Sequence, residues 1–396
     1  MTSIDSDAAV QRFLELAAIE GPSGREQAVM TSIVSMLTQA GVDPACFRFD
    51  DANTRSRLGG ETGNLVVRIP GTIQGPTTLL SAHTDTVPIC VGCDPVIDGD
   101  EVRSRNPQTG LGADDRAGCV AITTAVIELL RSGIDHPPVT LLFCIQEEVG
   151  LYGARHLDRE LLGRVDRAFN FDGGTVEKLT CGATGGERIT ITLHGIPAHA
   201  GVSPQAGASA IVMAATAISA LHQNGWLGRI DKPGIGTGTA NVGVIQGGDA
   251  TNVITPLVML RAEARSHDAA MRQRIVGEIE HACRRAASAV INDQGKAGEV
   301  EFETRVDYEA FSLAEDNPSV LAGEAAVRSV GRVPYRSISD GGLDANWLFR
   351  HGISAVTLGC GQRNIHTADE RLCIADFLDS CRVALHLISS IQEPAI

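Results

Sequence analysis

The chain has 396 residues, long enough for two or three domains that each bury a core. Apolar residues make up 43% and charged residues 20% of the sequence, a balance typical of globular proteins. The net charge of −15 and the lack of any basic tract argue against general affinity for nucleic acid. No signal-peptide pattern opens the chain, and the longest weakly polar stretch, 206–221, is too short to span a bilayer, so no membrane association is expected.

The ten cysteines are scattered, and most lie in apolar runs, where a buried free thiol is the ordinary state. Cys90 and Cys93 form a single CxxC pair, whose role the sequence leaves open. The pair lacks the second CxxC of a zinc ribbon, and Asp94-Pro95 follows where a thioredoxin-like motif would begin a helix. This cysteine usage indicates a reducing, cytoplasmic compartment.

In chain order, the first half alternates between helical periodicity and short apolar strands. Helices are expected over 7–19, 25–40 and 115–131, with a short one after Leu151. Strands are expected over 64–69, 77–82, 139–145 and 166–171. This alternation predicts an α/β domain with a mainly parallel sheet and helices on both faces.

The pattern changes after Gly182. The next elements are a strand, a helix, two strands, a helix and a strand, over 187–195, 205–221, 238–247, 257–266, 268–287 and 299–308. The order βαββαβ is that of the ferredoxin-like α+β unit. A helix from Asn317, a strand over 353–358 and a helix over 376–391 then resume the first pattern. The sequence therefore predicts one α/β domain, residues 1–184 and 309–396, interrupted by an inserted domain, residues 185–308.

Residues suited to metal binding follow several of these strands. The strand at 139–145 runs into Glu147 and Glu148, which point to different sides if the backbone stays extended. One of them could then bind a metal while the other reaches into the space beside it. His83 and Asp85 share one face at the end of another strand, so that the carboxylate can orient the imidazole.

Further acids and an imidazole stand at corresponding places. Asp114 and Asp115 open a helix, and Asp172 and His366 each follow a strand. Alone, each could be a helix cap or a solvated strand end. Ligands of open α/β sheets bind at the carboxyl ends of strands, so these side chains are expected to meet there. The expected ligands suffice for two divalent cations, Zn²⁺ with Mn²⁺ or Co²⁺ as alternatives, if one carboxylate bridges: His83, Asp114, Glu148, Asp172 and His366.

A set of short motifs occurs in a fixed order along the chain: HTDTVP, GADDRAG, QEEVGLYGA, DGG, GIPAHAG, NVITP and NIHTADE. Together they resemble the co-catalytic zinc peptidase superfamily of peptidase T, carboxypeptidase G and aminoacylase, and peptidase T and its relatives are the most similar. The resemblance implies that the inserted domain serves as a lid and joins two chains into a homodimer.

Carried over position by position, the resemblance also assigns the metal ligands. It implies that His83 and Asp172 bind one metal ion and that Glu148 and His366 bind the other. Asp114 would bridge the two ions, and the peptide bond that follows it would be cis.

The remaining site residues are likewise assigned by the resemblance. Glu147 matches the general base, and Asp85 matches the residue behind the histidine ligand. His199 matches a histidine that one subunit lends to its partner's active site. Asn252 and Arg265 match lid residues that hold the backbone or carboxylate of the substrate.

The resulting prediction is metal-dependent hydrolysis of amide bonds in short peptides, as in a tripeptide aminopeptidase or a related exopeptidase. An N-acyl-amino-acid amidohydrolase or a dipeptidase would use the same residues. A catalytically silent metal- or peptide-binding protein is the alternative from another class, although it would gain nothing from the unligated Glu147. A nucleotide-binding oxidoreductase is disfavoured, because the acids after Gly110–Ala113 would repel a pyrophosphate. Arg116 stands where the resembled families usually carry Lys, and it keeps the charge.

Overall fold

The computed structural model describes residues 4–389, which form two compact units. Unit 1 consists of residues 4–182, 312–339 and 343–389. Unit 2 consists of residues 183–311 and 340–342. The chain therefore leaves one α/β unit, builds an α+β unit and returns, and the predicted fold class is confirmed.

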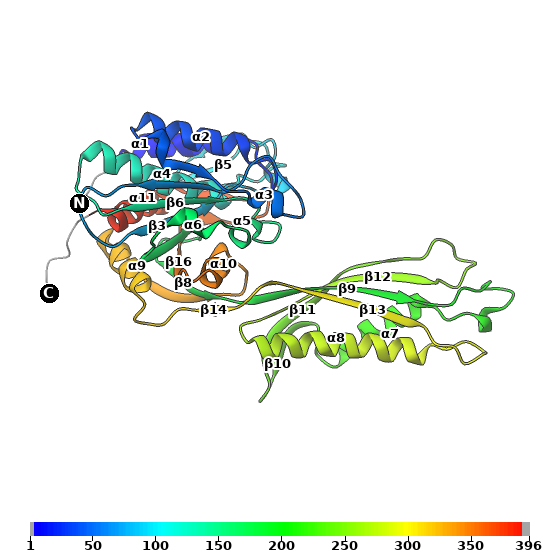
Figure 1. The fold of residues 1–396 in the computed structure, drawn as a ribbon. Helices are drawn as coiled ribbons and strands as arrows, with labels where there is room; N and C mark the ends of the chain where they lie inside the picture. The colour runs from blue at the N-terminus through cyan, green and yellow to red at the C-terminus, as the bar shows by residue number, and fades with distance from the viewer. Residues whose placement is uncertain (1–3, 390–396) are drawn as a thin grey trace. The chain divides into compact units, whose positions relative to one another are not determined.

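Unit 1 is built on a nine-stranded sheet with the order β1-β2-β6-β3-β7-β16-β8-β14, in which β15 also pairs with β8 (Figure 1). Its strands are β1 (Phe47–Phe49), β2 (Leu65–Ile69), β3 (Thr78–His83), β6 (Val139–Cys144), β7 (Arg167–Phe171), β8 (Lys178–Ala183), β14 (Phe311–Ser312), β15 (Tyr335–Ser339) and β16 (Ala355–Leu358). The neighbours β6, β3, β7 and β16 run parallel, whereas β1 and β2 on one side and β8 on the other pair antiparallel. The carboxyl ends of four adjacent strands therefore meet at one edge.

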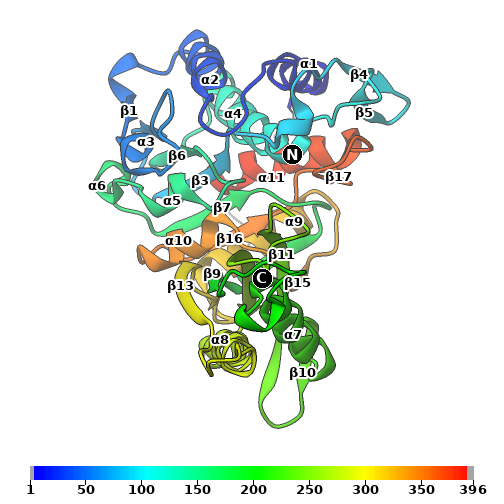
Figure 2. The ribbon, with the colours of Figure 1, turned by 90° about the vertical axis from the view of Figure 1, so that its right-hand side faces the viewer.

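Helices cover both faces of this sheet. They are α1 (Ser6–Ala17), α2 (Gln27–Gln39), α3 (Ala52–Arg55), α4 (Ala113–Ser132), α5 (Tyr152–Arg155), α6 (Arg159–Leu162), α9 (Pro318–Ser329), α10 (Asp344–Arg350) and α11 (Ile374–Ile388). Helices α4 and α11 lie on one side of β3 and β7, and α5 and α10 lie on the other (Figure 2). Every residue of β3 and β6 is consequently buried, which explains why these strands are continuous apolar runs rather than alternating ones.

A four-stranded sheet in unit 1, ordered β17-β18-β5-β4, is not among the predicted elements. Its strands are β4 (Pro95–Asp98), β5 (Glu101–Ser104), β17 (Gln362–Arg363) and β18 (Arg371–Cys373). They have two to four residues each, too few for alternation to be recognised in the sequence. The sheet matters because the loop between β17 and β18 carries His366.

Unit 2 is an antiparallel sheet with the order β10-β11-β12-β9-β13, and two helices pack on one of its faces (Figure 1). The elements are β9 (Gly185–His194), α7 (Ala210–Gln223), β10 (Gly228–Lys232), β11 (Gly236–Gly247), β12 (Leu257–Ser266), α8 (Ala269–Ala289) and β13 (Glu299–Tyr308). The order of β11, β12, β9 and β13 is the ferredoxin-like one, and β10 is an additional edge strand that the sequence pattern did not include. Ile189, Ile191 and Leu193 of β9 face the helices and form part of the core.

Most predicted helix boundaries lie within about two residues of the observed ones, and two differ by more. The helix predicted from residue 205 begins at Ala210, because Pro204–Ala206 form a 3₁₀ turn and the Ser209 side chain then caps the helix. The C-terminal helix ends at Ile388 and Ser389 has extended backbone angles, whereas residues 390 and 391 of the predicted helix lie outside the described residues. None of the helices within residues 4–389 is both long and apolar enough to cross a bilayer.

Helix α4 packs so closely on the sheet at Gly118 that an added Cβ would lie 1.8 Å from the carbonyl oxygen of Phe171. We expect Gly118→Ala to push α4 off the sheet and to lower the free energy of unfolding by at least about 1–3 kcal/mol. Gly277 is the matched control, because an added Cβ in this exposed part of α8 meets nothing within 4 Å. Gly277→Ala should stabilise the protein by about 0.5–1 kcal/mol. Scanning calorimetry of both variants tests the difference, and shifts of the same sign would contradict it.

Candidate metal centre and active site

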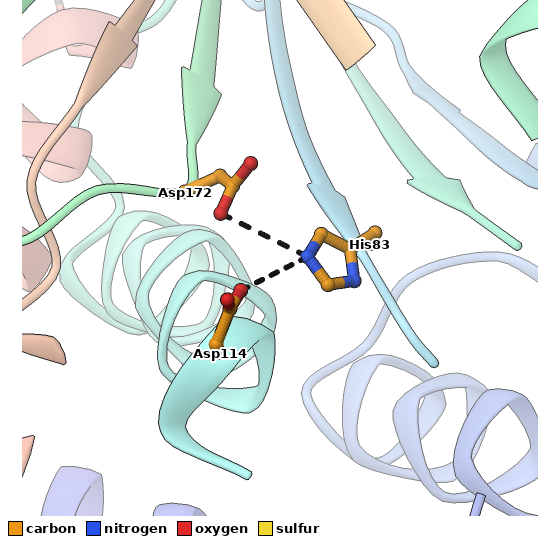
Figure 3. Close-up of side chains that lie close together, drawn as sticks. All are labelled: His83, Asp114 and Asp172. Atoms are coloured by element: carbon orange, nitrogen blue, oxygen red, sulfur yellow. Dashed lines mark hydrogen bonds and ion pairs between the residues drawn. The ribbon is translucent and has the colours of Figure 1, made fainter. Parts of the chain in front are cut away.

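Three side chains from separate elements of unit 1 meet at the carboxyl edge of the parallel strands. His83 is the last residue of β3, Asp114 lies at the start of α4, and Asp172 directly follows β7 (Figure 3). The Nε2 atom of His83 lies 3.1 Å from Oδ1 of Asp114 and 3.8 Å from Oδ1 of Asp172. Both carboxylates thus face the same imidazole nitrogen, and the three ligand atoms can hold one cation.

A second group shares Asp114 with the first. The Nε2 atom of His366 lies 3.1 Å from Oδ2 of Asp114 and 3.0 Å from Oε2 of Glu148. The two oxygens of Asp114 therefore face different imidazoles, as expected of a carboxylate placed between two cations. The three ligand atoms of each group lie within 4.8 Å of one another. The structure thus brings together all five residues expected as ligands.

The start of α4 is shaped around these contacts. Asp114 and Asp115 have non-helical backbone angles, and the peptide bond between them is cis, as the resemblance implied. The Asp115 carboxylate accepts hydrogen bonds from the backbone N–H of His83 at 3.1 Å, the N–H of Gly118 at 3.0 Å and the Gln362 amide at 2.9 Å. Asp115 therefore ties β3, α4 and β17 together, while its neighbour Asp114 faces the two imidazoles.

Asp85 connects the two ligand groups from behind. Nδ1 of His83, the nitrogen opposite the one that faces the carboxylates, lies 3.1 Å from the backbone carbonyl oxygen of Asp85 and 3.5 Å from its Oδ1. The same carboxylate accepts hydrogen bonds from the backbone N–H groups of Glu147 at 2.9 Å and Glu148 at 3.3 Å, and from the Ser23 hydroxyl at 2.6 Å. Asp85 is thus placed to orient the His83 ring, and it also fixes the backbone that carries both glutamates.

The backbone at the two glutamates is not the extended strand assumed from the sequence. β6 ends at Cys144, and Gln146 has a left-handed conformation with φ of 53°, which is uncommon for a residue other than glycine. The Gln146 side chain accepts a hydrogen bond from the Ser56 hydroxyl and donates one to the Gly59 carbonyl at 2.5 Å. These contacts hold the strained turn that directs the two glutamates.

Several acidic side chains lie close together in the site and shift the pKa values of one another and of the two histidines. Burial raises the pKa values of Asp172, Glu147 and Glu148. Burial alone would lower the pKa of His83, but hydrogen bonds to carboxylates, first that of Asp114, raise it well above its usual value. Hydrogen bonds to Asp114 and Glu148 likewise raise the pKa of His366 to about 10. The acids thus draw positive charge to the positions between them.

These residues fit divalent metal ions. Imidazole nitrogens and carboxylate oxygens are the ligands of catalytic Zn²⁺, and carboxylates also suit Mn²⁺. In the described part of the chain, Oε1 of Glu148 is buried and has no hydrogen-bond partner. A buried carboxylate oxygen left without a donor is costly, and coordination would satisfy it.

Two further acids, Glu370 and Asp344, are buried in this region. Glu370, buried in the β17–β18 loop, accepts hydrogen bonds from the N–H groups of Gly112 at 2.6 Å and Asp114 at 3.0 Å. It closes the NIHTADE motif, so a signal for it was present. Asp344, 1% exposed at the start of α10, lies beside the Cys144 thiol, and burial raises its pKa to about 6. In the sequence, the stretch Asp340–Asp344 fits a pocket-lining loop and an ordinary helix start equally well.

The loop before α2 also belongs to this region. Glu26 is fully buried, and its carboxylate accepts hydrogen bonds from the N–H groups of Gly24 at 2.8 Å and Gln146 at 3.2 Å. Arg116, also buried, donates to the carbonyl groups of Ile19 and Gly21, both at 3.4 Å. The arginine that replaces the expected lysine therefore anchors this loop.

The remaining predicted site residues lie in unit 2. His199 and Asn252 are exposed neighbours, since a β-bridge joins His199 to Val253. The Nδ1 atom of His199 accepts hydrogen bonds from the N–H groups of Gly201 and Val202, both at 3.1 Å. Arg265 lies on β12, where its guanidinium group donates two hydrogen bonds to Glu263.

An α/β unit with an inserted ferredoxin-like unit, and two ligand groups joined by one carboxylate, define the class as metal-dependent hydrolases. Residues 79–390 match the model of the peptidase family M20/M25/M40. The chain belongs to this family and is a peptide-bond hydrolase, which confirms the predicted family and reaction.

Individual relatives cover nearly the whole chain. An uncharacterized protein, YqjE, of Bacillus subtilis (strain 168) is 33% identical over 380 residues, which are 96% of this chain and 97% of that protein. A tripeptidase from Staphylococcus aureus subsp. aureus Mu50 has 30% identity, a TM-score of 0.87 and coverage of 97% and 98% of the two chains. Aminopeptidase PepT from Bacillus cereus ATCC 10987 has 31% identity, a TM-score of 0.84 and the same coverage.

The buried Glu26 makes stability depend on pH. Burial and then the neighbouring Asp85 carboxylate raise the pKa of Glu26 from 4.5 to about 7. Between pH 4.5 and about 7, Glu26 therefore keeps its proton in the folded protein but has lost it in the unfolded chain. The folded state loses stability as the pH rises through this range. Glu26→Gln cannot ionise, so its free energy of unfolding relative to wild type should improve by about 1–3 kcal/mol between pH 5 and pH 8. Denaturant unfolding at both pH values tests this, and an unchanged difference would refute it.

Proposed function

We propose that this chain is an exopeptidase that acts on short peptides, with tripeptides cleaved at the amino terminus as the first candidate reaction. The observation that carries the proposal is the sharing of Asp114 by the two ligand groups, with the half-buried Glu147 next to the proposed ligand Glu148. The similarity to a tripeptidase and to an aminopeptidase, each over 97% of this chain, supports the choice of short peptides.

His83 and Asp172 would hold one divalent cation, and Glu148 and His366 would hold the other. Asp114 would bind both cations. The expected ion is Zn²⁺, with Mn²⁺ or Co²⁺ as alternatives. When bound, such ions polarise the scissile carbonyl group and lower the pKa of a nucleophilic water. Asp85 would keep the ring of His83 in the orientation that presents Nε2 to the cation.

Glu147 is the proposed general base. Its neighbour Glu148 is engaged by His366, whereas Glu147 belongs to neither ligand group. Burial raises the pKa of Glu147, which brings its carboxylate closer to the pH at which it must accept a proton and release it again. It would take a proton from the attacking water and deliver it to the leaving amine.

Unit 2 would supply substrate contacts and act as a lid and dimerisation domain. Because Nδ1 of His199 accepts two hydrogen bonds, the neutral ring carries its proton on Nε2. That N–H could donate to the carbonyl oxygen of a substrate in the partner subunit of a homodimer. Asn252 would hold the peptide backbone, and Arg265 a carboxylate. All ten cysteines are free thiols, which supports a cytosolic location.

A panel of unblocked tripeptides, dipeptides, N-acetyl amino acids and N-terminally blocked tripeptides tests the substrate class. We expect hydrolysis of unblocked tripeptides by the metal-loaded protein to exceed that of the other substrates, with release of the amino-terminal residue seen by mass spectrometry. Prior removal of metal with a chelator should abolish turnover, and Zn²⁺, Mn²⁺ or Co²⁺ should restore it. Preferred cleavage of N-acetyl amino acids would instead assign the chain as an acylase. Metal binding without turnover would assign it as a binding protein.

Removing the proposed base should separate metal binding from catalysis. We expect Glu147→Gln to retain both metal ions and to lower kcat by at least about 10²-fold, because the amide cannot accept a proton. Glu147 lies outside both ligand groups, so the metal content measured by elemental analysis should match that of wild type. Near wild-type kcat in the metal-loaded variant would rule out this role.

Because His199 of each subunit would serve the active site of its partner, two inactive variants should restore activity when they form mixed dimers. Light scattering should report a dimer, and His199→Ala and Glu147→Gln should each be nearly inactive alone. Unfolding and refolding an equal mixture forms heterodimers in which one site has both residues, so activity should recover to about a quarter of wild type. An active monomer, or a mixture no more active than its parts, would contradict this arrangement.

A further inference from the structure

We propose that Glu26 is a positioning residue for the peptidase reaction: its buried carboxylate fixes the turn at Gln146–Glu148 and thereby aims Glu147. The proposal rests on the function proposed above, because it assumes that the orientation of Glu147 limits turnover. Glu26 lies outside both ligand groups and far from Glu147 in the sequence.

The contacts of Glu26 point to the turn. Its Oε1 accepts hydrogen bonds from the N–H of Gly24 at 2.8 Å and from the N–H of Gln146 at 3.2 Å. The second of these holds the backbone at the residue whose left-handed φ of 53° begins the turn. A residue in this conformation persists only where its surroundings hold it. Glu26 restrains the N–H of Gln146, and the N–H of Tyr152 bonds the Gln146 carbonyl at 3.1 Å.

The same loop holds the turn at a second point. Ser23 donates a hydrogen bond to Asp85 at 2.6 Å, and Asp85 accepts the N–H groups of Glu147 and Glu148. The N–H groups of three consecutive residues from Gln146 onward are therefore bonded to carboxylates, one to Glu26 and two to Asp85. The loop is attached further by the hydrogen bond from the N–H of Thr86 to the carbonyl of Gly21.

Helix capping does not explain why Glu26 is buried. It occupies the N-cap position of α2, but its side chain makes no capping hydrogen bond to that helix. Within residues 4–389 its Oε2 is buried and has no hydrogen-bond partner. Burying a carboxylate with one oxygen unsatisfied is unfavourable. The hydrogen bonds that hold Glu26 in this position are therefore those that Oε1 accepts from the N–H groups of Gly24 and Gln146.

Three variants test the proposal. Glu26→Gln retains an oxygen acceptor, Glu26→Leu removes it, and Arg25→Ala, at an exposed neighbour in the same loop, is the matched control. In Glu26→Leu we expect kcat to fall at least about tenfold while KM stays within about threefold, since ground-state binding does not use the base. Glu26→Gln should restore kcat to within about threefold of wild type, and Arg25→Ala should match wild type.

Hydrogen exchange provides a readout that does not depend on activity. The amides of Glu147 and Glu148 should exchange at least about tenfold faster in Glu26→Leu than in wild type, Glu26→Gln or Arg25→Ala. Unchanged exchange in a folded Glu26→Leu overturns the proposal, and so does equal damage by Glu26→Gln. If the amides exchange faster in Glu26→Leu but the wild-type protein hydrolyses no peptide, the structural restraint stands and the proposed function is rejected.

If Glu26→Leu does not fold, Ser23→Ala provides the test of this loop. It removes only the hydroxyl that bonds Asp85, and it should speed exchange of the same two amides and lower kcat without changing KM. Glu26→Gln keeps the hydrogen bond to the N–H of Gln146. In the double variant with Glu26→Gln, the effect of Ser23→Ala on exchange and kcat should therefore stay the same within about twofold. Unchanged exchange and kcat in Ser23→Ala would overturn the role of this loop.

Discussion

Concentrated negative charge at one edge of the parallel sheet is the constraint on which the rest of the structure depends. The side chains of Asp114, Asp172 and Glu148 lie there with little access to water, beside the half-buried Glu147. Their mutual repulsion must be offset by positive charge. Two imidazoles supply part of that charge, and divalent cations would supply the remainder. The same repulsion makes a stable apolar frame necessary, since side chains that repel one another must be held in place by the elements that carry them.

Much of that frame consists of backbone hydrogen bonds rather than direct contacts between ligands. Asp115 and Glu370 accept hydrogen bonds from the main-chain N–H groups of the proposed ligands His83 and Asp114, and Asp85 accepts those of the two glutamates. Carboxylates that accept main-chain N–H groups fix the backbone, and through it the direction of the neighbouring side chain. This explains why several acids that bind no metal in the proposed scheme are nevertheless buried at the site.

In the proposed scheme, the two units carry different parts of the site. Unit 1 carries all the ligand atoms and the proposed base, whereas the candidates for substrate recognition, His199, Asn252 and Arg265, belong to unit 2. The guanidinium of Arg265 is engaged by Glu263, so a substrate carboxylate would have to compete with that acid. Such competition favours an anionic group that can accept two hydrogen bonds at once.

The sequence by itself determined the inserted α/β architecture and singled out the five candidate ligands that the structure brings together, because alternating apolar segments and acids at strand ends are local patterns. The strands β1, β8, β10, β14 and β15 and those of the four-stranded sheet were missed. All of them except β8 have five residues or fewer, and such short strands are stabilised by their neighbours and carry little periodicity. The direction of Glu147 and Glu148 was decided by tertiary structure alone: the left-handed Gln146 depends on Glu26, Ser56 and Gly59, which lie 87 to 120 residues away. No local pattern encodes such contacts, because they form only when the loop before α2 packs against the end of β6.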